Sequence, residues 1–244
     1  MAGSFHLIVA YVLSASFFDG ALMTLSISLA SLLGGMVVGL LLAVLQEVRW
    51  APVRAAAVVY LWLFRGTPVL FQLIFLFNVL PSFGIVLPGF TCAVLALALN
   101  EGAYMAEIMR SGIHAVGRGQ RLAARALGMT DWQVMRCVVL PQALRIVIPP
   151  IGNQFIGMLK LSALVSVIAV NDLLLVANQT ASANFRYLEA LSAAGIYYLA
   201  MTTLLMIGQS VLERALRRRG RRGEGHIRLS QRLLGVMMGA GSVR

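Results

Sequence analysis

Long apolar runs alternate with short polar segments along most of the chain. Each of these runs is long enough to cross about 30 Å of hydrocarbon as a helix. Five such runs cover residues 20–46, 55–80, 90–110, 149–170 and 190–212. The pattern predicts an all-α integral membrane protein with five transmembrane helices. A shorter apolar stretch, residues 7–18, predicts an interfacial helix that ends at Asp19-Gly20.

The second apolar run is interrupted by Arg65-Gly66-Thr67-Pro68. Pro68 has no backbone N–H, so a carbonyl of the preceding turn loses its helical donor. The sequence therefore predicts a broken helix with a cation beside it, an arrangement that suits an anionic group such as a carboxylate. The alternative is that Arg65 extends to the headgroups and that Pro68 makes a packing kink.

Other ionisable and polar side chains lie inside apolar runs, where they are costly and usually functional. Glu101 is a candidate partner for Arg65, for Lys160 or for a substrate ammonium, and a structural ion pair is the alternative. Asn153, Gly157 and Lys160 share one helical stripe, which indicates a pore lining or, alternatively, hydrogen bonds between helices. The candidate residues of a substrate path are Arg65, Thr67, Gln72, Glu101, Asn153, Gln154, Lys160 and Ser162.

The polar segment between the third and fourth runs predicts two short helices. Residues 119–127 are rich in strong helix formers, and Gly128 stands where a left-handed cap belongs. Thr130 opens a second helix, since residues 130–133 fit a capping box. Pro141 is expected to stop that helix or to kink its junction with the next one. We call this predicted helix–glycine–helix segment, residues 119–141, the knob.

Composition agrees with a membrane protein. The chain is 59% hydrophobic and 12% charged, with a mean hydropathy of +0.85, whereas soluble domains carry about 25% charged residues. The net charge of +11 lies mostly in segments between or after apolar runs, which indicates membrane topology rather than nucleic-acid binding. Arg residues occur in the 49–54 loop, in the 111–148 segment and in the tail, so the N-terminus is expected outside and the C-terminus in the cytoplasm.

No catalytic constellation stands out in the sequence. It contains no nucleophile–base motif, no Walker A motif and no Cys-x-x-Cys metal spacing. The two cysteines, Cys92 and Cys137, are expected toward opposite membrane faces, too far apart for a disulfide. If transport uses ATP, another chain must bind and hydrolyse it.

The knob resembles the coupling loop, or "EAA" loop, of ABC importer permeases. The family pattern is Glu-Ala-Ala, three residues, Gly, about nine residues, an Ile-like residue, one residue and Leu-Pro. The residues on this pattern are Ala123, Ala124, Gly128, Val138, Leu140 and Pro141, with Leu122 at the Glu position. Blocks similar to the polar amino-acid branch are residues 65–68, 100–104, 124–128, 140–145 and 149–160.

This resemblance, over roughly residues 17–215, implies a type I ABC importer transmembrane domain with a cytoplasmic coupling helix. The coupling residues that it implies are Arg121, Leu122, Ala123, Ala124, Gly128, Leu140 and Pro141. In this branch the residue after Lys160 is commonly acidic, whereas this chain has Leu161. The departure disfavours a cationic substrate such as arginine.

The resemblance also implies partners. They are a second permease subunit in a homo- or heterodimer, two cytosolic ATP-binding subunits that hold ATP and Mg²⁺, and an extracytoplasmic solute-binding protein. The chain itself is expected to hold no cofactor and to be multi-pass in a bacterial inner membrane. The expected organisation is an extracytoplasmic segment (residues 1–19), a permease domain (20–215) and a basic cytoplasmic tail (216–244).

Two other classes of function compete with an ATP-driven importer. An ion-coupled secondary transporter would use Glu101 and Lys160 as a relay, and its uptake would follow an ion gradient without an ATPase. An intramembrane enzyme is disfavoured because nucleophile–base pairs are absent from the sequence.

Overall fold

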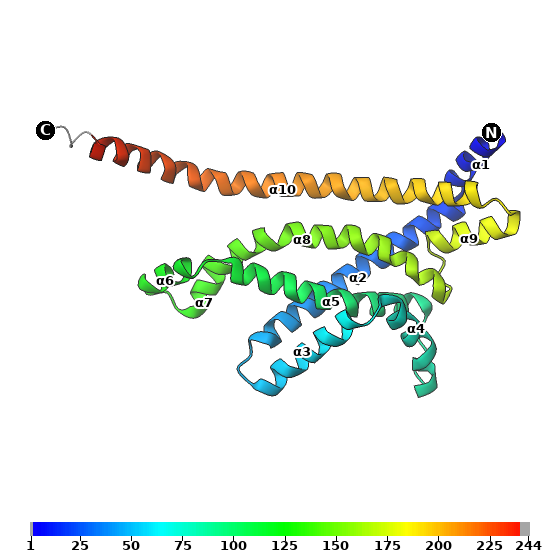
Figure 1. Cartoon of the computed structure of the whole chain (residues 1–244), viewed down its shortest axis with the longest axis horizontal. Coiled ribbons are helices and arrows are strands. Elements are labelled where there is room, and N and C mark those ends of the chain that lie inside the picture. Colours follow the sequence, from blue (N-terminus) through cyan, green and yellow to red (C-terminus); the bar gives the residue numbers. More distant parts are fainter. Residues whose placement is uncertain (1, 240–244) are drawn as a thin grey trace. The chain divides into compact units, whose positions relative to one another are not determined.

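The computed structural model describes the backbone of residues 2–239 and the side chains of residues 4–216. In these residues every regular element is a helix (Figure 1). The elements are α1 (Ala2–Val12), α2 (Ala15–Glu47), α3 (Ala51–Gly66), α4 (Val69–Val79), η1 (Leu80–Phe83), α5 (Gly89–Ala115), α6 (Arg118–Ala126), α7 (Asp131–Gln133), η2 (Val134–Val139), α8 (Leu140–Leu161), η3 (Ser162–Ile168), α9 (Leu173–Asn184) and α10 (Tyr187–Gly239). The site described below lies in the compact unit formed by residues 1–204.

Among the described residues, four helical stretches are long and apolar enough to cross a membrane. They are Ala15–Glu47, Gly89–Ala115, Asp131–Ile168 and Tyr187–Leu216. A fifth span is possible if the pair Ala51–Gly66 and Val69–Phe83, bent by 101°, counts as one broken span. The predicted all-α class is confirmed, and the bent pair covers the second of the five predicted apolar runs, residues 55–80.

Three predicted boundaries differ in the structure. Residues 171–189 were expected to be a polar loop, but α9 fills most of that segment because Asp172 caps its N-terminus. The Asp172 carboxylate accepts hydrogen bonds from the backbone N–H groups of Leu174 at 3.2 Å and Leu175 at 3.0 Å. The expected helix end at Asp19-Gly20 is also wrong, since the break falls at Ser14, whose backbone is extended as in an N-cap.

Of the two outcomes predicted at Pro141, a stop or a kinked junction, the stop is wrong. The fourth apolar helix begins at Leu140 rather than Pro149, and η2, a π-helix, leads into it without a break. The Leu140 N–H donates to the carbonyl of Met135, five residues back. In such a wide turn the donor for each carbonyl is shifted by one residue, so the missing N–H of Pro141 is tolerated.

Close packing of α2 against α5 forms the centre of the fold. A Cβ atom added at Gly39 of α2 would lie 2.4 Å from the Cβ of Met105, and one at Gly102 of α5 would lie 2.5 Å from Val38. The two backbones can approach this closely only because these positions are glycines. Three small residues of α2, Gly34, Gly35 and Gly39, all lie in this contact.

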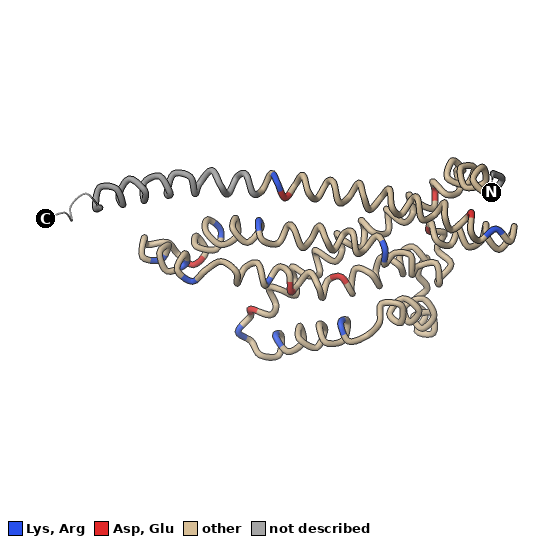
Figure 2. Tube along the Cα trace, turned by 45° about the horizontal axis from the view of Figure 1, so that its top comes forward, with Lys and Arg blue, Asp and Glu red and all other residues tan. Residues whose placement is uncertain are grey.

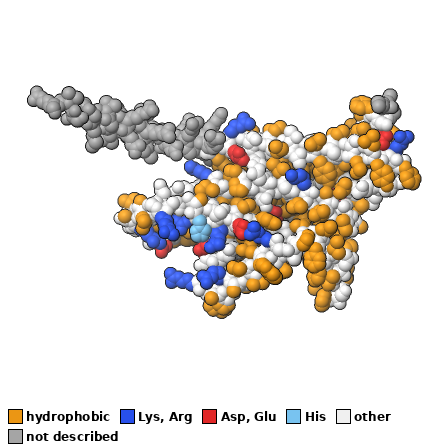
Figure 3. All heavy atoms as spheres, viewed as in Figure 1, with side chains coloured by type: hydrophobic (Ala, Val, Ile, Leu, Met, Phe, Trp, Pro, Cys, Tyr) orange, Lys and Arg blue, Asp and Glu red, His pale blue; other side chains and the backbone are white. Residues whose placement is uncertain are grey.

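Basic side chains gather at one end of the described bundle. Figure 2 shows most Lys and Arg residues near the connection between α2 and α3 and around the knob. In the face drawn in Figure 3, hydrophobic side chains cover α4 and much of the surface away from that end. This separation is typical of a helical protein that spans a bilayer. Beyond Leu216, the predicted basic tail lies outside the residues whose side chains are described.

A first prediction tests the contact between α2 and α5. Replacing Gly39 by Val places side-chain atoms where Met105 and the backbone of Ala106 already lie. We expect the variant to lose about 1–3 kcal/mol of stability, measured as a lower thermal midpoint of the purified chain in detergent. The control is Gly195→Ala in α10, where an added Cβ meets no atom within 4 Å. An unchanged midpoint for Gly39→Val would contradict the packing.

Candidate substrate path and coupling knob

The break between α3 and α4 is stabilised by two buried amides. Pro68, which lacks an N–H, stands four residues after Phe64 and leaves the Phe64 carbonyl without its helical donor. The Asn100 amide donates to that carbonyl at 2.9 Å, and the Gln72 amide donates to it at 3.0 Å. Asn100 is 4% exposed and Gln72 is 7% exposed. The predicted broken helix is confirmed, with the carbonyl satisfied by side chains from α5 and α4.

Thr67 and Gln72, both predicted in the substrate path, take part in this bend. The Thr67 hydroxyl donates to the Leu63 carbonyl at 2.8 Å and accepts from the Gln72 amide at 2.8 Å. The Gln72 carbonyl oxygen accepts from Asn100 at 3.2 Å. The two side chains line a groove of about 370 Å³ at the bend, together with Leu63, Phe64, Phe71, Phe75 and Leu76. The polar atoms of Thr67 and Gln72 therefore form hydrogen bonds within the protein.

A separate cavity of about 210 Å³ lies next to the bend. Its lining residues come from α4, α5 and α8 and are Val69, Asn100, Glu101, Tyr104, Gln154, Gly157, Met158 and Leu161. Glu101 is only 3% exposed, and its carboxylate accepts a hydrogen bond from the Gln154 amide at 2.9 Å. The structure thus brings together two predicted residues, Glu101 and Gln154. A buried carboxylate with polar neighbours can bind a small cationic group.

Tyr104 was missed as a lining residue. It follows Glu101 by three positions on α5, and residues at this spacing share a helix face. Asn100, quoted above only as part of a sequence block, lines the same cavity beside the carboxylate. The spacing of these residues along α5 could therefore have predicted that Tyr104 lies near Glu101.

Arg65 lies beside this cavity wall but does not line it. Its guanidinium forms an ion pair with Glu107 of α5 and lies 5.5 Å from the centre of the Tyr104 ring. The side chain is 41% exposed. Its ion-pair partner among the described side chains is thus Glu107 and not Glu101, the partner considered from the sequence. A role for Arg65 in binding a substrate carboxylate stays a prediction.

The fourth apolar helix contributes less to the cavity than predicted. Of the stripe formed by Asn153, Gly157 and Lys160, only Gly157 lines it, while the other two side chains are exposed. Among the side chains that the structure describes, Lys160 forms no ion pair. Ser162 is fully buried, and its hydroxyl donates to the Leu159 carbonyl at 2.8 Å. The Ser162 hydroxyl is therefore satisfied within its own helix.

The knob has the caps that the sequence predicts. Gly128 has φ of +80°, a left-handed conformation that glycine adopts without strain. The N–H of Met129 donates to the Ala124 carbonyl at 3.2 Å, and that of Gly128 donates to the Arg125 carbonyl at 2.9 Å, which together form a Schellman cap. Thr130 forms the predicted capping box. The angle between α6 and η2 is therefore fixed by local hydrogen bonds.

The knob has a buried side and an exposed side. Ala124 is 5% exposed and packs in a cluster with Val116, Val134, Val139 and Ala143. Leu122 is 63% exposed, Leu127 is 85% exposed and Trp132 is 70% exposed. Ala123, Gly128, Leu140 and Pro141 are also exposed. An exposed apolar surface of this kind is typical of a protein–protein contact, and Leu127 was missed as part of it.

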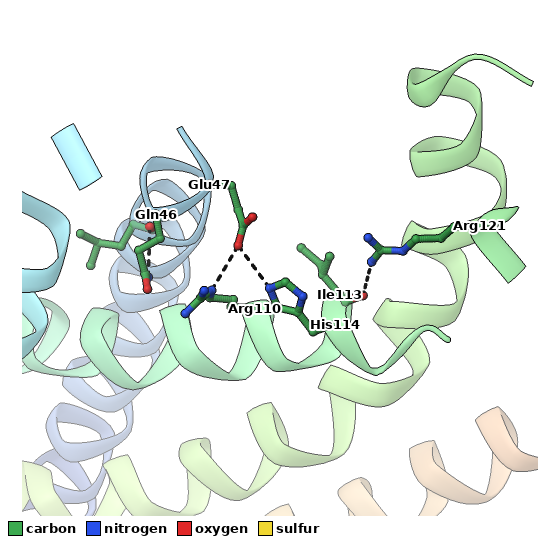
Figure 4. Close-up of polar contacts among 7 residues, drawn as sticks. Gln46, Glu47, Arg110, Ile113, His114 and Arg121 are labelled. Carbon is green, nitrogen blue, oxygen red and sulfur yellow. Dashed lines mark hydrogen bonds and ion pairs between the residues drawn. The ribbon is translucent and has the colours of Figure 1, made fainter. Parts of the chain in front are cut away.

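Arg121 differs from the other predicted coupling residues. Its guanidinium points back toward α5, where it donates to the carbonyl of Ile113 at 2.6 Å (Figure 4). Beside it, the carboxylate of Glu47 at the end of α2 accepts from Arg110 at 3.1 Å, and the same oxygen lies 3.2 Å from His114. These polar contacts between distant segments were not predicted.

Comparison with known proteins gives consistent results. The pattern of the family described as binding-protein-dependent transport system inner membrane component matches residues 35–218. The arginine transport system permease protein ArgU of Corynebacterium glutamicum is 39% identical over 219 residues, which cover 84% of this chain and 69% of ArgU. The glutamine transport system permease protein GlnP of Escherichia coli is 38% identical over 201 residues, which cover 82% of this chain and 92% of GlnP.

Solved structures show the same likeness. One chain of a crystal structure of an amino acid ABC transporter with histidines is 42% identical, with a TM-score of 0.79 over 82% of this chain and 94% of that one. A chain of the MetNI methionine ABC transporter in an inward-facing conformation shares the fold at 20% identity, with a TM-score of 0.69 over 82% and 96% of the two chains. The predicted fold class is confirmed.

A second prediction concerns the bend between α3 and α4. Gln72→Leu keeps the approximate volume but removes the hydrogen bonds to the Phe64 and Thr67 carbonyls. We expect a loss of about 1–3 kcal/mol, because a buried polar group is left without a partner. The thermal midpoint in detergent measures this loss. Asn78→Leu is the control, since Asn78 is exposed on the same helix and bonds only within it. Equal midpoints for the two variants would speak against the role of Gln72.

Proposed function

The chain belongs to the binding-protein-dependent transport system inner membrane components, and we propose that it carries a neutral polar amino acid through the cavity around Glu101. It is a membrane-spanning permease subunit of an ABC importer for amino acids. The observation that carries the proposal is the convergence of the Glu101 carboxylate and the amides of Gln154 and Asn100 in one cavity between apolar helices. Such groups complement a small zwitterion.

The chemistry of the cavity suits an amino acid. The Glu101 carboxylate is the complement of an α-ammonium group, because charge-assisted hydrogen bonds are the stronger ones. The Gln154 amide can donate to or accept from a polar side chain, whereas Asn100, whose N–H groups bond the bend, can offer its carbonyl oxygen as an acceptor. The volume of about 210 Å³ is below the roughly 300–1,000 Å³ of pockets for drug-sized ligands. Arg65, whose guanidinium lies 5.5 Å from the centre of the Tyr104 ring, is the proposed partner of the substrate carboxylate on a path through the cavity.

The choice between a neutral and a basic substrate rests on Leu161. The relatives named above include an arginine and a glutamine permease protein. An arginine substrate carries two cationic groups and calls for two carboxylates. In this chain Leu161 lines the cavity at the position where an acidic residue is common in the branch. A neutral polar substrate, which needs only Glu101, is therefore favoured.

Transport is proposed to depend on partner subunits. ATP and Mg²⁺ are bound by two separate cytosolic ATPase subunits, since the sequence has no phosphate-binding loop of its own. These subunits hold the knob through the exposed surface around Leu122, Leu127 and Trp132. A second permease subunit, identical or different, completes the path, and an extracytoplasmic binding protein delivers the substrate. Closure of the ATPases on ATP moves the knob and opens the spans outward.

A secondary transporter is the less favoured alternative. Its relay would need Glu101 and Lys160 to exchange a proton, whereas Glu101 bonds Gln154 and the Lys160 side chain is exposed. The test is uptake into proteoliposomes that contain the complex of this chain with its ATPase and binding protein. Uptake should require ATP inside and should persist when ionophores collapse the ion gradients. Uptake that follows an ion gradient without ATP would overturn the proposal.

A third prediction tests the carboxylate. Glu101→Gln keeps the shape but removes the charge, so the apparent KM for uptake should rise by roughly tenfold to a hundredfold. Assembly with the ATPase should be unchanged, because the knob is not altered. Asp19→Asn is the control, since Asp19 is an exposed carboxylate on α2 that does not line the cavity. An unaltered KM in Glu101→Gln, measured at matched membrane abundance, would remove Glu101 from the site.

A fourth prediction concerns orientation. Since basic residues favour the cytoplasmic side, a reporter fused after Arg214 should report the cytoplasm. A reporter inserted in the uncharged 81–89 loop should report the outside, and one inserted at Gly128 should report the cytoplasm. Alkaline phosphatase and fluorescent-protein fusions distinguish the two sides. Identical results from the first two fusions would exclude five spans with the N-terminus outside.

A further inference from the structure

The bond between Arg121 and Ile113 joins the knob to the end of α5. Ile113 lies in the last turn of α5, where backbone carbonyls have no partner within the helix. Arg121 donates to this carbonyl at 2.6 Å, and a cation at a helix C-terminus is also favoured by the helix dipole. Figure 4 shows the guanidinium directed toward this last turn of α5.

The Arg121 side chain faces the interior of the knob. Its Nε atom is buried and has no hydrogen-bond partner among the described residues. Arg121 and Ala124 are three residues apart and lie on one face of α6, and Ala124 packs in the buried cluster. Leu122 and Ala123 are exposed on the remaining surface. A guanidinium held in this way is turned away from a partner that covers the exposed side.

The position of the bond matters because the knob is attached unequally at its two ends. Toward α8 the chain continues as helix through η2. Toward α5 the backbone leaves the helix at Val116 (φ −72°, ψ 110°) and Gly117 (φ −53°, ψ 143°), although Ile113 and Val116 pack against the buried cluster of the knob. Val116 is buried, but an added Cβ at Gly117 meets no atom within 4 Å. This connection is therefore a hinge, and the Arg121 bond spans it.

The end of α5 is in turn connected to the cavity. Glu101 and Ile113 lie on the same unbroken helix, about 18 Å apart along its axis. Near this end, Glu47 bonds Arg110 and approaches His114, which connects α2 to α5. A displacement delivered to the last turn of α5 thus reaches the cavity wall through one rigid helix.

We propose that Arg121 is a positioning residue that couples the knob to α5, and not a contact for the ATPase. The inference rests on the proposed function and deepens it. Motion that the ATPase imposes on the knob reaches α8 through the continuous helix and reaches α5 through the Arg121 bond. The cavity walls formed by α5 and α8 then move together.

A fifth prediction follows for Arg121→Ala. The knob should still bind the ATPase, since its exposed surface is unchanged, but the ratio of substrate imported to ATP hydrolysed should fall roughly tenfold. Proteoliposomes with the full complex measure both rates. Arg118→Ala is the matched control, because Arg118 is an exposed arginine on the same helix, and its ratio should equal that of the wild type. Arg121→Lys should retain most of the ratio, since one N–H donor is enough for a single carbonyl.

A second substitution distinguishes two roles of Arg121: an anchor, meaning a bond that holds the knob to α5, and a contact with the ATPase. Gly117→Ala restricts the hinge without touching another atom. In the Arg121→Ala background it should restore part of the lost ratio, or restore assembly if Arg121→Ala fails to assemble. No restoration by Gly117→Ala would overturn the inference. So would weaker ATPase binding by Arg121→Ala together with a normal ratio in the complexes that form, because that result assigns Arg121 to the ATPase interface.

The anchor can also be tested without transport. In the purified chain, Arg121→Ala should increase hydrogen exchange of the backbone amides in residues 116–127, and Arg118→Ala should not. Equal exchange in the two variants would overturn the inference even if the complex transports. If the wild-type complex shows no ATP-dependent uptake while this exchange difference is present, the proposed function fails and the anchor stands.

Discussion

The need to satisfy every backbone polar group away from water shapes this molecule. The Phe64 carbonyl is the clearest case, because Pro68 removes its helical donor in the second apolar run. Two amides, from Asn100 and Gln72, occupy that carbonyl. The bond from Asn100 requires α5 to lie close to the bend. The close glycine packing between α2 and α5 holds α5 in that position. The break in one helix therefore dictates which residues a neighbouring helix must present.

The same requirement explains why the cavity lies where it does. Successive residues of a helix point about 100° apart, so Asn100 and Glu101 face different neighbours. Asn100 serves the bend between α3 and α4, and Glu101 meets Gln154 of α8. Of these two adjacent polar residues, Asn100 thus stabilises the fold and Glu101 supplies the carboxylate of the cavity. The bend also places Val69, the first residue of α4, in the cavity wall.

Features that depend on local chemistry were predictable from the sequence. The break at Pro68 and the caps at Gly128 and Thr130 follow from residues within a few positions of one another, as do the apolar runs. Features that depend on which helices meet were not predictable. The partners of Arg65 and Arg121 lie on α5, and only the docked helices place Glu107 and the Ile113 carbonyl within their reach. The helix α9 was missed because no long apolar run marks residues 171–189, and only the capping signal of Asp172 indicates a helix there.

The long helix α5 brings these parts into one mechanical element. Asn100 of this helix donates to the Phe64 carbonyl at the bend, and the next residue, Glu101, supplies the buried carboxylate. In the last turn of the helix, the Ile113 carbonyl accepts a hydrogen bond from Arg121. Because the helix is unbroken over Gly89–Ala115, none of these contacts can shift along the axis without displacing the others. A sequence with few charges can then link the exposed surface of the knob to a buried cavity with a few well-placed polar groups. The cost is that each of these groups must keep its partner, since lipid offers no substitute.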